Sequence, residues 1–153
     1  MIKNFAFGKQ FLRRFYYGED CGHNEKKPAI VPWSKFILES ARNNRFEVIK
    51  KQVKYIHSQD NKYGFEKKCD LDVEMAIDLI EEIDNYDTII LFSGDGDLMR
   101  AIKHLKYKHN KSCYVFGARN HVGREVYDAK TMGYVDDILY AEDFEYRLNP
   151  TRF

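Results

Sequence analysis

The 153-residue sequence lacks several features that would identify common classes of protein. It has only three cysteines, at positions 21, 69 and 113, and no Cys-x-x-Cys pair. This argues against a disulfide framework or a zinc site and favours reduced thiols in a cytoplasmic protein. No apolar run approaches the roughly 18 residues that a membrane span needs, and the first residues are too polar for a signal peptide. We therefore expect no membrane association.

Charge and catalytic motifs exclude further classes. The net charge is +1, which rules out the bulk electrostatics of a strongly basic nucleic-acid binder, so any RNA contact must come from a local patch. The five histidines form no HxxH or HExxH pair, and no GxGxxG or P-loop motif occurs. With 44% hydrophobic and 32% charged residues, the sequence predicts a folded chain, and residues 1–153 suit a single domain.

Strand and helix patterns alternate from residue 33 onwards, which predicts an α/β fold with a mostly parallel sheet. Trp33, Phe36, Ile37 and Ala41 share one side of the first predicted helix. The strands are expected at residues 11–17, 46–57, 87–92, 113–116 and 134–140, the helices at 33–43, 72–83, 97–109 and 121–130, and a polar loop at 58–68.

The most informative stretch is Thr88 to Met99, in which an apolar strand ends in Ser-Gly-Asp-Gly-Asp. A buried parallel strand would place Asp95 and Asp97 at the carboxyl edge of the sheet, where open α/β folds bind their ligands. Two adjacent carboxylates are costly there unless a cation neutralises them, which favours a divalent metal site and phosphoester chemistry. The alternative for Asp97 is that it caps the following helix, while Ser93 could simply bond within the turn.

The predicted helix at 72–83 carries an apolar stripe, and Asp72 falls inside that apolar arc at its first turn. Two explanations remain open, and they do not exclude each other. Either Asp72 or Asp70 caps the helix, or Asp72 points over the sheet edge toward Asp95 and Asp97. The stripe consists of Val73, Ala76, Ile77, Ile80 and Ile83, flanked by Leu79.

Two segments together resemble the NYN domain, in its bacterial LabA-like branch: residues 68–78 (KCDLDVEMAID) and residues 86–98 (YDTIILFSGDGDL). The later His121-Val-Gly-Arg-Glu125 also resembles a helix start of this family. The resemblance implies a Rossmann-like, PIN-like three-layer fold with a mostly parallel central sheet. It also implies a ribonuclease whose catalytic, metal-binding residues are Asp72, Asp95 and Asp97, with Mg²⁺ or Mn²⁺ as the cofactor. Asp78 matches a recurrent acid of the family, but lies on the solvated arc of its helix.

One departure from the family pattern concerns the N-terminal segment. The family opens with a strand that ends in an aspartate. Residues 1–7 could be a remnant of that strand, but Gly8 stands where the acid would come. We therefore expect a domain that is N-terminally incomplete, with exposed strand edges that favour a homo-oligomer. Glu19 and Asp20 could substitute for the missing acid or lie in a solvated loop.

Basic residues near the predicted acidic edge are candidates for RNA phosphate contacts: Arg100, Lys103, Arg119 and Arg124. Each could also be an ordinary solvated charge.

Three functions stay open. The first is a divalent-metal-dependent ribonuclease, and the second is a catalytically impaired NYN-like domain that acts as an RNA- or protein-binding regulator. The third is another metal-dependent phosphoester enzyme, such as a phosphatase.

Overall fold

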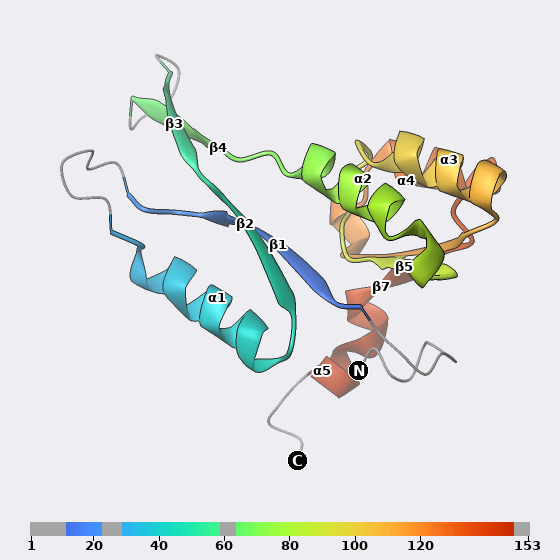
Figure 1. The fold of residues 1–153 in the computed structure, drawn as a ribbon, viewed down its shortest axis with the longest axis horizontal. Helices are drawn as coiled ribbons and strands as arrows, with labels where there is room; N and C mark the ends of the chain where they lie inside the picture. The colour runs from blue at the N-terminus through green and yellow to red at the C-terminus, as the bar shows by residue number, and fades with distance from the viewer. Residues whose placement is uncertain (1–11, 23–28, 59–63, 149–153) are drawn as a thin grey trace. The chain divides into compact units, whose positions relative to one another are not determined.

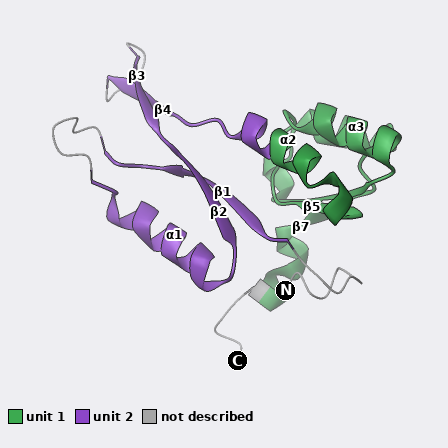
Figure 2. Ribbon diagram, viewed as in Figure 1, with its two compact units in different colours: residues 1, 76–153 green, residues 2–75 purple. Residues whose placement is uncertain are grey.

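The computed structural model describes residues 12–22, 29–58 and 64–148, and the chain divides into two compact units (Figure 2). We call residues 2–75 the N-terminal unit and residues 76–153 the C-terminal unit. The segment at residues 1–7 and Gly8, where the family's opening strand and acid were sought, lies outside the described residues.

A parallel βαβ motif forms the base of the N-terminal unit (Figure 1). Strand β1 (Arg14–Glu19) pairs with β2 (Glu47–Gln52), and helix α1 (Pro32–Asn43) connects them. Pro32 suits the first turn of α1, because an N–H there would have no helical partner.

The buried face of α1 differs from the one that the sequence predicted. Ser34, Leu38 and Ala41 are buried, whereas Trp33 and Phe36 are 68% and 61% exposed and stack on each other. Of the residues expected on a common side of this helix, Ala41 is therefore buried, whereas Trp33 and Phe36 are exposed. Ser34 can occupy the buried face because its hydroxyl oxygen accepts the backbone N–H of Asp20, at 3.1 Å.

A β-hairpin follows the βαβ motif in the N-terminal unit. Strands β3 (Lys54–His57) and β4 (Phe65–Lys68) pair antiparallel, so the single strand expected at 46–57 is broken at Val53 and the polar loop expected at 58–68 ends in a strand. The Val53 N–H donates to the Glu19 carbonyl at 3.0 Å as the last bond between β1 and β2, and from Lys54 onwards the chain pairs with β4 instead. A cross-strand contact of Tyr55 with Phe65 stabilises β4 despite its polar sequence.

The C-terminal unit contains a three-stranded parallel sheet in the order β5-β6-β7. The strands are β5 (Thr88–Leu91), β6 (Ser112–Gly117) and β7 (Asp137–Tyr140), all within the predicted regions or one residue of them. Helix α3 (Met99–His109) follows β5 and α4 (Arg124–Thr131) follows β6, preceded by the 3₁₀ helix η3 (Arg119–His121). The right-handed α3 ends at Asn110, whose φ of 53° is one that asparagine tolerates. The last described elements of this unit are η4 (Ala141–Phe144) and α5 (Glu145–Leu148), which the sequence did not predict.

The core of the C-terminal unit lies where α3 and α4 meet the sheet. Its largest fully buried side chains are Ile102, Leu105, Cys113, Val115, Val126 and Val135. The Asp136 carboxylate links α3 to β6 beside this core. It accepts hydrogen bonds from the Lys106 ammonium, at 2.5 Å, and from the Cys113 N–H, at 2.7 Å. Burial raises the pKa of the Cys113 thiol to about 12, so this cysteine stays a neutral packing residue.

Helix α2 (Asp72–Glu81) and the 3₁₀ helix η2 (Ile83–Asn85) precede β5. The predicted helix is present, but its apolar stripe is not buried: Val73, Ile77 and Ile80 are 65%, 49% and 51% exposed. The expectation of a core-facing stripe was wrong at these positions, since periodicity predicts an apolar face but not the surface that covers it.

Three further expectations concern membrane-spanning helices, the cysteines and the fold class. Over the described ranges no helix combines the length and apolar character that crossing a bilayer requires. All three cysteines are free, as the sequence predicted. Parallel strand pairing with connecting helices in both units confirms the α/β class.

Candidate metal centre

The Ser-Gly-Asp-Gly-Asp segment leaves the carboxyl end of β5 as a tight loop. Ser93 Oγ accepts the Asp95 N–H at 3.0 Å, which is the turn role considered for this serine. Asp95 Oδ1 in turn accepts the Asp97 N–H at 3.1 Å. These two bonds fix the direction of the Asp95 carboxylate before any ligand binds.

Capping does not account for Asp97. Leu98 is the residue that precedes the first turn of α3, and no side chain makes a capping hydrogen bond there. The Met99 N–H instead donates to the Gly96 carbonyl at 2.9 Å. The Asp97 carboxylate is exposed at the strand end, where the metal hypothesis requires it.

Two glycines allow this loop to press against the segment between β6 and α4. A Cβ on Gly94 would lie 1.7 Å from the His121 carbonyl oxygen, and a Cβ on Gly96 would lie 2.5 Å from Glu125 Cβ. The Gly123 N–H donates to the Gly94 carbonyl at 2.7 Å and locks the contact. Only glycine at positions 94 and 96 permits this approach without displacement of the backbone.

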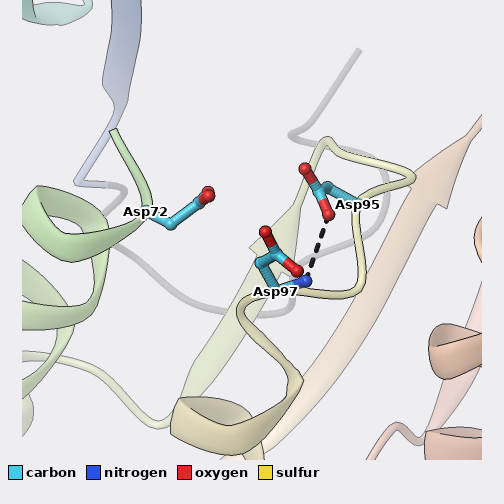
Figure 3. Close-up of side chains that lie close together, drawn as sticks. All are labelled: Asp72, Asp95 and Asp97. Carbon is cyan, nitrogen blue, oxygen red and sulfur yellow. Dashed lines mark hydrogen bonds between the residues drawn. The ribbon is translucent and has the colours of Figure 1, made fainter. Parts of the chain in front are cut away.

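The two acids at the start of α2 have different roles in the structure. Asp70 Oδ1 accepts the Asp72 N–H at 3.0 Å, so Asp70 satisfies a free donor at the helix start. This backbone hydrogen bond from Asp72 lowers the pKa of Asp70. Asp72 is the first residue of α2, and its carboxylate is directed toward Asp95 and Asp97 (Figure 3).

Asp72, Asp95 and Asp97 each offer a carboxylate oxygen, and these oxygens lie within 4.8 Å of one another (Figure 3). Opposite oxygen ligands of Mg²⁺ are about 4 Å apart, twice the usual metal–oxygen distance. Each of the three residues thus offers one carboxylate oxygen as a ligand. Carboxylate oxygens are also the ligand type that hard divalent cations prefer, so the donor set fits Mg²⁺ or Mn²⁺.

The alternative acids at the end of β1 have other partners. Glu19 Oε1 accepts the Lys50 ammonium at 2.7 Å. Asp20 accepts the Lys67 ammonium at 2.7 Å and the Tyr55 hydroxyl at 2.5 Å. The hydrogen bonds from Lys67 and then Tyr55 lower the pKa of Asp20 from 3.8 to about 2. Asp20 therefore joins the β3–β4 hairpin to the end of β1.

The four predicted RNA-contact residues differ in exposure and in the contacts that their side chains already make within the chain. Arg100 and Lys103 are exposed on α3, and the Lys103 ammonium lies 5.8 Å from the centre of the Tyr134 ring. Arg124 is 90% exposed and only loosely paired with Asp128, at 3.9 Å. Arg119 makes two contacts within the chain: its guanidinium pairs with Asp143 and lies over the Tyr140 ring.

Sequence reasoning missed one acidic residue at this loop. Glu125 was noted only as part of a helix-start motif, yet its side chain packs directly on Gly96. Gly96, between the two aspartates, indicates that some segment approaches the loop closely, but it does not indicate which one. The contact joins residues 29 positions apart in the chain. No local pattern predicts such a contact.

Comparison with known proteins identifies relatives of the chain. A sequence profile of the NYN domain matches residues 1–137. The chain is 35% identical over 91 residues to the low amplitude and bright protein LabA of Synechococcus elongatus, a match that covers 60% of this chain and 48% of that protein. The matched region is thus about half of the relative. A solved structure of a protein of unknown function from Vibrio parahaemolyticus has a TM-score of 0.59 at 25% identity, covering 85% of this chain and 68% of the other.

Proposed function

The chain belongs to the NYN domain family, a family of PIN-like nucleases, and from this premise we propose that it hydrolyses RNA with the aid of a divalent cation. The observation that carries the proposal is the convergence of three carboxylates, from Asp72, Asp95 and Asp97, beside the carboxyl end of β5. The cofactor proposed is Mg²⁺ or Mn²⁺.

Each site residue has a defined task in this proposal. The cation would make a bound water nucleophilic near neutral pH and offset charge on the scissile phosphate. Asp72, Asp95 and Asp97 hold that cation through oxygen ligands. Ser93 acts one step away, since its hydroxyl accepts the Asp95 N–H and so keeps the loop in its binding shape.

RNA would be held through its phosphates rather than its bases. We assign this role to Arg100, Lys103, Arg119 and Arg124, which carry the positive charge that a polyanion requires on a chain of near-zero net charge. Among them Arg124 and Arg100 are the most available, because Arg119 would have to exchange its contact with Asp143 for a phosphate. The chain's own contribution to affinity is therefore expected to depend strongly on salt.

The proposal is tested by cleavage of a labelled single-stranded RNA in the presence of Mn²⁺, Mg²⁺ or EDTA. Asp95→Asn removes one ligand charge at nearly constant volume, and Asp84→Asn on η2 is a charge-matched control at an exposed position. We expect Asp95→Asn to reduce the cleavage rate at least about 100-fold, with Asp84→Asn unchanged.

The same assay separates the ribonuclease from the alternative function. A folded wild-type chain that cleaves no RNA with either metal would refute the enzymatic proposal. Retention of RNA by that inactive chain, measured by fluorescence anisotropy, would instead favour a catalytically impaired RNA-binding regulator.

A further inference from the structure

Glu125 lies against the loop that carries Asp95 and Asp97. It is in the first turn of α4, and a Cβ built on Gly96 would lie 3.0 Å from its Cγ and from its Oε2. A Cβ on Gly123 would also lie 3.0 Å from Glu125 Oε2. The Glu125 side chain is exposed, and its carboxylate lies beside the two glycines.

An acid in the first turn of a helix interacts favourably with the helix dipole, but the Glu125 side chain also lies against the acidic loop. The residue before α4 is Gly123, and no side chain makes a capping hydrogen bond at that end. Glu125 is also outside the group of carboxylates whose oxygens lie within 4.8 Å of one another. It is therefore a fourth acid beside the centre that neither caps a helix nor belongs to the ligand set.

We propose that Glu125 is a positioning residue of the acidic centre, which adds its negative charge to cation binding by Asp95 and Asp97 and holds their loop by contact with Gly96. This inference rests on the proposed metal-dependent function. It assigns to α4 a role in the centre, although α4 supplies none of the three ligands.

The charge and the packing of Glu125 make different contributions. Removal of one charge at an exposed position near a divalent cation should weaken its binding about 5- to 10-fold, and added salt should reduce that difference. Loss of the side chain would in addition release Gly96. Changes at residues that support metal ligands commonly cost 10- to 100-fold in affinity.

The test measures binding of Mn²⁺ alone, without RNA, by electron paramagnetic resonance. Glu125→Gln removes the charge and keeps the shape, Glu125→Ala removes both, and Asp128→Asn is a charge-matched control one turn further along α4. We expect Mn²⁺ affinity to fall about 5- to 10-fold in Glu125→Gln, further in Glu125→Ala, and less than about 2-fold in Asp128→Asn. The loss in Glu125→Gln should shrink in about 0.5 M salt.

Two contrary outcomes can be told apart by including Asp95→Asn. If Asp95→Asn lowers Mn²⁺ affinity but Glu125→Gln does not, the role of Glu125 is refuted and the metal centre stands. If Asp95→Asn leaves Mn²⁺ affinity unchanged, the proposed centre itself fails. Because Glu125→Gln preserves the packing, the result does not depend on whether Glu125→Ala folds.

Discussion

Gly94→Ala is the substitution that most directly perturbs the geometry of the acidic loop. The added Cβ would lie 1.7 Å from the His121 carbonyl oxygen, whereas real Cβ contacts are essentially never shorter than 3.0 Å. The loop or the η3–α4 connection must therefore move by at least 1.3 Å, the difference between those two distances. The Gly123 N–H to Gly94 carbonyl bond, now 2.7 Å, would be stretched or lost.

The size of the effect follows from these two changes. Overpacking of this kind costs about 1–3 kcal/mol, and loss of one hydrogen bond adds about 1 kcal/mol. We therefore expect the free energy of unfolding to fall by about 2–4 kcal/mol. Because binding sites tolerate displacements of only about 0.5 Å, Mn²⁺ affinity should fall at least about 10-fold.

Thermal unfolding and Mn²⁺ titration of the same samples provide the assay. Gly133→Ala is the control: its φ of 82° is costly for alanine, by about 1–2 kcal/mol, but nothing lies within 4 Å of the added Cβ. The control should lose stability and keep its Mn²⁺ affinity. A folded Gly94→Ala chain with wild-type Mn²⁺ affinity would refute the view that this close approach shapes the centre.

Three further predictions concern other parts of the chain. The pKa of Asp20 is lowered from 3.8 to about 2, so its stabilisation is present above pH 3.8 and is lost as the pH falls toward 2. After allowance for solvent screening this is about 1 kcal/mol, and acid titration of wild type against Asp20→Asn should show a difference above pH 4 that disappears near pH 2. Arg124→Ala should weaken RNA binding and reduce its salt dependence more than Arg119→Ala does; equal slopes in a salt titration would contradict the ranking. The apolar strand β5 is an edge of its sheet among the described residues and should promote self-association, which a monomer mass in light scattering would disprove.

Local patterns determined much of the fold and of the centre. The apolar run at β5 followed by Ser-Gly-Asp-Gly-Asp placed Asp95 and Asp97 correctly at a strand end, because a strand and the turn after it depend on neighbouring residues. The alternation of strands and helices gave the α/β class for the same reason. Boundaries were less well predicted, as at β2 and β3, because β2 pairs with β1 whereas β3 pairs with β4.

Contacts between distant segments were decided only by the tertiary structure. The sequence predicted apolar faces on α1 and α2, but Trp33 and Ile77 are exposed, because a face is buried only where another surface meets it. It left open whether Asp70 or Asp72 caps α2, and the Asp70–Asp72 bond answered that. It could not place Glu125 on Gly96, since packing between loops depends on the whole path of the chain. The sequence by itself thus indicated which acids are candidates for cation binding, because residue type and local pattern suffice for that. The tertiary structure decided which segments pack against the loop that carries Asp95 and Asp97, because such contacts join distant parts of the chain.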